Sequence, residues 1–176
     1  MNVSKVTMFC YGEKEKWYKR QVRSGMLPAI ELDDGRIITE SDVILAELEK
    51  EFGPVGKDKI SMHSEEAIPL RRLERSIFSA WCRWLCYRQC GVEDEEASRT
   101  YFVRVANEVE KKLKATPGPF FLNHLSIVDL IFLPYLERMN ASLFYYKGFR
   151  LRDEKRFPYI SNWFSALELR ETYRGT

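Results

Sequence analysis

Two pairs of residues, Leu27-Pro28 and Glu40-Ser41, have types and surroundings suited to holding a small polar ligand. Pro28 has no N–H group and cannot donate to a sheet ladder, so backbone groups of its neighbour Leu27 are left available to a ligand. An X-Pro bond that enters a strand from a tight turn is also the usual setting for a cis peptide. The first pair therefore predicts an exposed stretch of backbone that a peptide could pair with.

The second pair lies where a predicted strand turns into a predicted helix. The unpaired N–H groups and the positive dipole end of that helix point at one spot, which suits a carboxylate, with the Ser41 hydroxyl as a further donor. Glu40 beside it can accept from an ammonium group. The two pairs together predict that the ligand is a peptide whose head group carries a carboxylate and an amine on one carbon. The alternative is that Glu40 is an ordinary first-turn acid and Ser41 an ordinary helix cap.

The elements that must position these residues alternate between strand and helix. Alternation and β-formers predict a strand over 3–10, and charged residues with apolar ones at helical intervals predict a helix over 13–22. Strands over 29–33 and 36–39 are separated by Asp34-Gly35, a two-residue hairpin signal. A helix capped by Thr39 or Ser41 follows to about residue 51, and its predicted buried stripe consists of Val43, Ile44, Leu48 and Phe52.

Only helices are predicted beyond the turn-rich stretch 53–62, which is the linker candidate. Helices are expected over 65–90, 94–114, 125–139 and after Pro158. The third of these is apolar on nearly every side, which predicts a buried helix, and Ser126 and Asp129 have the spacing of a capping box at its start. The expected layout is a small α/β domain over 1–52 and an all-helical domain over 63–176.

Composition excludes several classes of function. The chain of 176 residues has 28 basic and 26 acidic residues, a net charge of +2, so no strong attraction to nucleic acid is expected. No stretch approaches the roughly 18 apolar residues of a membrane-spanning helix. Four cysteines without a Cys-x-x-Cys pair indicate reduced thiols in a cytoplasm-like compartment, with an organelle possible after removal of a transit segment.

Three of the cysteines, Cys82, Cys86 and Cys90, recur every four residues and are predicted to line one face of the helix over 65–90. Spread over about 12 Å and without a fourth ligand, they are poorly placed for zinc, so no metal is expected and they are interpreted as packing residues. Cys10 is also interpreted as structural. His63 and His124 are isolated, and nothing pairs either with a nucleophile.

Several segments resemble the glutathione transferases in order and spacing. The stretch SGMLPAIELDDGRIITESDVI resembles their glutathione-binding half, and KEKWYKRQVRSGMLPAIEL resembles the second helix and third strand of the omega and lambda classes. FGPVG falls where that family joins its two domains. SIVDLIFLPYLERM resembles the capped core helix of the family, and FPYISNWFSALELRETY resembles its late helix. The resemblance covers almost the whole chain.

The resemblance implies a thioredoxin-like first domain, with the order strand–helix–strand–strand–helix, and a helical second domain. It implies that the backbone of Leu27 pairs with the cysteinyl part of glutathione, that Glu40 and Ser41 hold the γ-glutamyl end, and that Lys14 approaches the glycyl carboxylate. It also implies a hydrophobic electrophile as co-substrate and a homodimer. Candidate walls of the pocket for that electrophile are Trp81, Trp84 and Tyr87, with core packing as the alternative.

One departure from the family concerns the start of the chain. In glutathione transferases a further strand and helix come first and carry the thiol-activating residue, and they would need about 25 to 30 residues that do not precede Ser24 here. No catalytic residue is therefore assigned, and we expect either that the first domain is incomplete or that another segment fills the gap. The leading hypothesis is an enzyme that transfers or exchanges the thiol of glutathione. The alternative is a non-catalytic scaffold or a subunit of a larger assembly.

Overall fold

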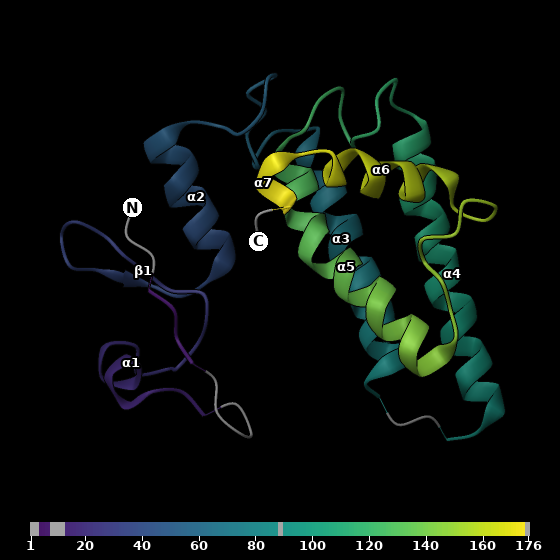
Figure 1. Ribbon diagram of the computed structural model, residues 1–176, viewed down its shortest axis with the longest axis horizontal. Helices are drawn as coiled ribbons and strands as arrows, with labels where there is room; N and C mark the ends of the chain where they lie inside the picture. The colour runs from purple at the N-terminus through teal and green to yellow at the C-terminus, as the bar shows by residue number, and fades with distance from the viewer. Residues whose placement is uncertain (1–3, 8–12, 88–89, 175–176) are drawn as a thin grey trace. The chain divides into compact units, whose positions relative to one another are not determined.

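A computed structural model describes residues 4–7, 13–87 and 90–174 of the chain. The chain forms two compact units, Met1–Gly53 and Pro54–Thr176, and each is considered by itself (Figure 1). The first unit contains a hairpin and two helices, and the second unit is helical. Most of the stretch considered as a linker, from Pro54 onward, clusters with the second unit.

The first unit is built around a short antiparallel hairpin. Its elements are α1 (Lys16–Gln21), β1 (Ile30–Glu31), β2 (Ile37–Ile38) and α2 (Ser41–Phe52). The predicted two-residue turn is wrong by one residue. The Leu32 N–H donates to the Arg36 carbonyl at 2.9 Å and the Gly35 N–H donates to the Leu32 carbonyl at 2.9 Å, so the loop has three residues. Gly35 closes it with a φ of 79°, a left-handed conformation that glycine adopts readily.

Two further expectations for the first unit need correction. Residues 4–7 of the predicted strand 3–10 are not in a strand, because the sheet of the described chain pairs β1 with β2 alone. Val3 and residues 8–10 of that prediction lie outside the described residues. In α2 only Ile44 is buried, whereas Val43 and Phe52 are 48% and 73% exposed. Val43 lies about 100° around the helix from Ile44, and Phe52 is its last residue.

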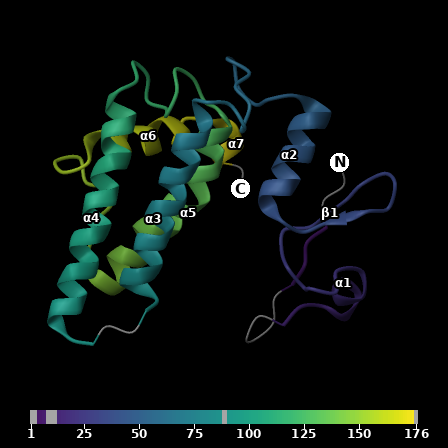
Figure 2. The ribbon, with the colours of Figure 1, turned by 180° about the vertical axis from the view of Figure 1, so that it is seen from behind.

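The second unit packs long helices side by side. Their bounds are α3 (Ala67–Leu85), α4 (Val92–Lys114), α5 (Ile127–Lys147), α6 (Pro158–Glu168) and α7 (Glu171–Arg174). Helix α3 packs against α4 and α5, and α6 packs against α4, as two opposite views show (Figures 1 and 2). The core is rich in aromatic rings, including Trp84, Phe102, Phe132 and Trp163. In the described residues no helix is long and apolar enough to cross a membrane.

Helix α5 begins with the predicted capping box, which is confirmed. The Asp129 carboxylate accepts from the Ser126 N–H at 2.9 Å and from the Ser126 hydroxyl at 3.0 Å. It also accepts from the Phe121 N–H at 3.1 Å. Burial raises the pKa of Asp129, although these donors favour its charged form. The helix runs on to Lys147, beyond the predicted end, and stops at Gly148 in a left-handed conformation.

The segment that follows the first unit is tied to the start of α5. Gly56 forms an antiparallel bridge with Ser126. A Cβ at Gly56, whose φ is 91°, would lie only 2.0 Å from the Leu125 carbonyl oxygen, so no larger residue fits there without movement. Nearby, Nδ1 of His124 lies 2.9 Å from the Asp58 carboxylate, so His124 has a partner that the sequence did not reveal.

The cysteines do not line one face of a helix, and this prediction is wrong. Helix α3 ends at Leu85, so Cys86 is its C-terminal cap residue and Cys90 lies beyond it, and both are exposed. Of the three described cysteines, only Cys82 is partly buried, and burial raises the pKa of its thiol. Cys10 lies outside the described residues. Among the described residues no group of three metal-ligating side chains comes together.

Candidate functional site

The hairpin register relates the two residue pairs singled out in the sequence. Ile30 lies opposite Ile38 and Glu31 lies opposite Ile37. The ladder ends at Ile30 and Ile38, so Pro28, two residues before Ile30, and Glu40, two residues after Ile38, both extend from the open end of the hairpin. The Leu27-Pro28 peptide is cis. The exposed backbone before Pro28 and the start of α2 therefore belong to the same end of the first unit.

Leu27 follows a turn that several hydrogen bonds hold in place. The hydroxyl of Tyr18, in α1, donates to the Met26 carbonyl. The Met26 N–H donates to the Ser24 hydroxyl at 3.3 Å, and the Gly25 N–H donates to the Val22 carbonyl at 2.8 Å. The Leu27 residue itself is 41% exposed, and its backbone groups have no hydrogen-bond partner in the described part of the chain. Its N–H and C=O can therefore pair with a peptide.

Tyr18 is the residue of this site that the sequence analysis did not single out. Its side chain is buried in α1, and burial raises the pKa of its hydroxyl. The sequence signal for Tyr18 was its place among lysines and an arginine in the six-residue helix KWYKRQ. It indicated a buried face but did not reveal which backbone group the hydroxyl would bind.

Lys14 lies beside the same turn. A Cβ placed on Gly25 would be 4.0 Å from the Lys14 Cδ, so the apolar stem of the lysine runs along the residues just before Leu27. The residue is partly buried, with the aliphatic stem against the turn. A lysine in this place adds a positive charge near the turn that precedes Leu27.

The N-terminus of α2 has no side-chain cap. Glu40 occupies the cap position with an extended backbone (φ −84°, ψ 121°), and Ser41 is the first helical residue rather than the cap. Both side chains are exposed, and neither has a hydrogen bond within the residues that the structure describes. The Glu40 side chain makes no cap hydrogen bond, and the positive dipole end of this twelve-residue helix favours an anion.

The three candidate pocket residues in the second unit differ in their surroundings. Trp84 is only 2% exposed; its indole N–H donates to Glu95 Oε1 at 2.6 Å, and its ring packs against Phe102. These contacts favour the core-packing alternative for Trp84. Trp81 is partly buried and donates to the Ser142 hydroxyl at 3.1 Å. Tyr87 is exposed beyond the end of α3.

Comparison with known proteins identifies the family. The family model for the glutathione S-transferase N-terminal domain matches residues 2–51, and the model for the glutathione S-transferase C-terminal domain matches residues 93–166. The two matches follow one another in the order that this family has, and together they cover more than half of the chain. The chain belongs to the glutathione S-transferase family, with a thioredoxin-like first domain and a helical second domain.

A curated relative agrees with this assignment. Glutathione S-transferase L3 of Arabidopsis thaliana is 26% identical over 168 residues, which are 94% of this chain and 66% of the relative. The chain thus spans just under two thirds of the length of that relative.

Solved structures show the same fold. Glutathione transferase Omega 3C from Trametes versicolor superposes with a TM-score of 0.71 at 20% identity, covering 92% of this chain and 71% of the other. Ure2p5 from Phanerochaete chrysosporium, cocrystallized with 1-(S-glutathionyl)-2,4-dinitrobenzene, gives a TM-score of 0.61 at 22% identity, covering 90% and 76%. At these identities the likeness concerns the fold.

Proposed function

We propose that this chain binds glutathione at the open end of the β1–β2 hairpin and transfers or exchanges the thiol of the tripeptide. The co-substrate would be a hydrophobic electrophile or a mixed disulfide. The hairpin register carries the proposal, because it brings the unpaired backbone of Leu27 and the uncapped start of α2 to one end of the first unit. Ure2p5, which shares the fold and was cocrystallized with 1-(S-glutathionyl)-2,4-dinitrobenzene, supports the choice of ligand.

Each part of glutathione has a counterpart in this arrangement. The cysteinyl backbone would pair with the N–H and C=O of Leu27. The γ-glutamyl carboxylate would accept from the first N–H groups of α2 and from the Ser41 hydroxyl, while its ammonium group would donate to Glu40. Lys14, beside the turn at Gly25, would meet the glycyl carboxylate. No residue is assigned to the activation of the thiol.

The proposal extends to the compartment of the protein, the pocket for the electrophile and the oligomeric state. A reducing compartment such as the cytoplasm suits a protein that uses a free thiol, and the cysteines of the described residues are free. Trp81 and Tyr87 remain candidate walls for the electrophile, and a homodimer remains a prediction. Each of these points can be tested separately from glutathione binding.

Retention on immobilised glutathione tests the proposal. Glu40→Ala and Ser41→Ala should each weaken retention about tenfold, because each removes a charge-assisted contact. Glu51→Ala is the matched control, since this exposed glutamate lies in the last turn of the same helix and should leave retention unchanged. Equal retention of the parent protein and all three variants would reject the site.

A further inference from the structure

A hollow with a mainly apolar lining lies in the surface of the helical unit. It has a volume of about 270 Å³ and is lined by Asn140, Ala141 and Phe144 of α5 together with Arg150 and Arg152 of the segment that follows. We propose that this hollow binds a small organic anion, a molecule with one oxyanion group and one apolar ring. The proposal does not depend on the glutathione site, which lies in the other unit.

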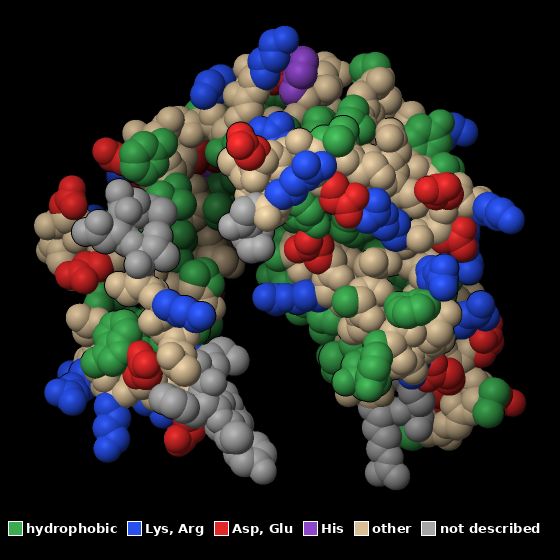
Figure 3. Space-filling model, in the orientation of Figure 1, with side chains coloured by type: hydrophobic (Ala, Val, Ile, Leu, Met, Phe, Trp, Pro, Cys, Tyr) green, Lys and Arg blue, Asp and Glu red, His purple; other side chains and the backbone are tan. Residues whose placement is uncertain are grey.

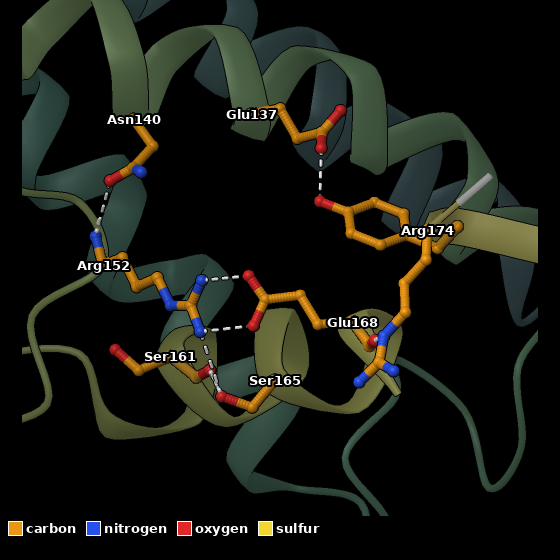
Figure 4. Close-up of polar contacts among 8 residues, drawn as sticks. Glu137, Asn140, Arg152, Ser161, Ser165, Glu168 and Arg174 are labelled. Carbon is orange, nitrogen blue, oxygen red and sulfur yellow. Dashed lines mark hydrogen bonds and ion pairs between the residues drawn. The ribbon is translucent and has the colours of Figure 1, made fainter. Parts of the chain in front are cut away.

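One of the two arginines is already neutralised. Arg152 forms a bidentate ion pair with Glu168 of α6, with Nη2 2.8 Å from Oε2 (Figure 4). Its guanidinium also donates to the Ser165 hydroxyl at 3.2 Å. The pair raises the pKa of Arg152 and lowers that of Glu168. Because the two charges cancel, Arg152 contributes directional N–H groups to the hollow rather than a net charge.

Arg150 supplies the net charge. It is exposed, and its guanidinium lies over the Phe144 ring, 5.0 Å from the ring centre. Within the residues that the structure describes, Arg150 has no carboxylate partner. A guanidinium held against an aromatic face, with no acid paired to it, is suited to a carboxylate or phosphate oxygen.

The remaining polar groups of the hollow are also donors. The side-chain oxygen of Asn140 accepts from the backbone N–H of Arg152 at 3.1 Å (Figure 4). The side-chain NH₂ group of Asn140 is left without an acceptor among the described residues. The Nε–H of Arg152 is likewise unused in that part of the chain. None of the five lining side chains carries a carboxylate. A lining of donors excludes cations and favours an anion.

The size and the apolar lining restrict the ligand further. Drug-sized ligands occupy pockets of about 300 to 1,000 Å³, and this hollow is smaller. Ala141 and the Phe144 ring offer an apolar surface beside the arginines. A single ring that bears one oxyanion group therefore fits the chemistry and the space, with an expected dissociation constant of about 1 mM.

Titration of the full chain with benzoate tests this proposal, followed by amide chemical shifts in NMR spectra. Benzoate should give saturable shifts centred on Ala141, Phe144 and Arg150, and benzamide, a neutral molecule of the same shape, should give none. Arg150→Gln should weaken benzoate binding about tenfold, because it removes the unpaired charge. Arg156→Gln is the matched control: this exposed arginine follows α5 too and lies over the Phe149 ring at 5.3 Å.

Three results would overturn the proposal: shifts that do not saturate, equal responses to benzoate and benzamide, or equal losses in the two arginine variants. A repeat with Glu40→Ala and Ser41→Ala separates the two sites. These variants should bind benzoate as the parent does, and a loss of benzoate binding in them would assign the shifts to the first unit instead. Phenyl phosphate serves as a second probe, to compare a phosphate with a carboxylate.

Discussion

The indole N–H of Trp163 donates a 2.9 Å hydrogen bond to Oδ1 of Asp129, and this bond joins α6 to the first turn of α5. Both side chains are fully buried. The same carboxylate closes the capping box with Ser126 and accepts from the Phe121 N–H. One side chain thus satisfies groups from α5, α6 and the loop before α5, and its loss would leave several buried donors unpaired.

Asp129→Ala should therefore lower the free energy of unfolding by about 3 kcal/mol or more, the sum of a lost cap and of buried donors without acceptors. Trp163→Phe removes a single donor and should cost less. Urea unfolding followed by circular dichroism measures both. Asp153→Ala, which removes a half-buried carboxylate that accepts from the Lys155 and Arg156 N–H groups at 2.9 and 3.2 Å, is the control. A smaller loss for Asp129→Ala than for Asp153→Ala would contradict the argument.

Glu110 of α4 caps the start of α6 from outside that helix. Its two carboxylate oxygens accept from the N–H groups of Tyr159 and Ile160, each at 2.8 Å. Glu110→Ala should lower the free energy of unfolding by about 1 to 2 kcal/mol, the usual value of a helix cap. Glu108→Ala removes only an exposed pair with Lys111 on the same helix and should change it by less than about 0.5 kcal/mol. Thermal unfolding of both variants checks this difference.

Tyr18→Phe tests whether the turn before Leu27 is positioned from α1. The substitution removes the hydroxyl that donates to the Met26 carbonyl and keeps the buried ring. Retention on immobilised glutathione should fall about threefold to tenfold, because a misplaced Leu27 backbone would bind less well. Tyr146→Phe, at an exposed position of α5, should have no effect. Unchanged retention in Tyr18→Phe would show that the turn holds without this bond.

The environment of Glu95 makes stability depend on pH. An ion pair with Lys147 at 2.7 Å and a hydrogen bond from the Trp84 indole hold the pKa of Glu95 below its ordinary value of 4.5. Since folding favours the charged carboxylate, its contribution is complete above about pH 4.5 and is lost as the pH falls through the folded-state pKa.

Glu95→Gln should accordingly reduce stability at pH 6 and flatten its decline between about pH 5 and 3. Urea unfolding at several pH values measures this slope. Glu96→Gln, next along α4 and exposed, should keep the slope of the parent protein. A steeper acid decline in Glu95→Gln than in the parent would show that the sign is wrong.

Local signals in the sequence predicted the elements near the site, because they act over a few residues. Asp34-Gly35 predicted the hairpin, and the Ser126–Asp129 spacing predicted the start of α5. The loop gained one residue because a turn plus a left-handed glycine also fits an Asp-Gly pair. The sequence could not show that Asp129 also binds Trp163, thirty-four residues away, since such contacts depend on packing.

Hydrophobic and cysteine periodicity did not predict correctly where helix α3 ends. The spacing of Cys82, Cys86 and Cys90 continues a helical repeat past Leu85, but a repeat does not fix where a helix stops. The alternating pattern over residues 4–7 likewise gave no strand, because a strand also needs a neighbour to pair with. For the candidate site, residue types were enough to propose Leu27 and Glu40. Tyr18 binds the Met26 carbonyl eight residues away, and only the folded turn brings the two together.

The close approach of Gly56 to Leu125 and Ser126 determines where a fragment must begin if the helical unit is to be expressed on its own. Gly56 pairs with Ser126, Asp58 meets His124, and the Arg71 guanidinium donates to the Met62 carbonyl at 3.3 Å. A fragment that started at the first turn of α3 would lose all three ties and expose the start of α5. A fragment that starts at Pro54 keeps them, so the loop that resembles a dispensable connector is part of what must be cloned.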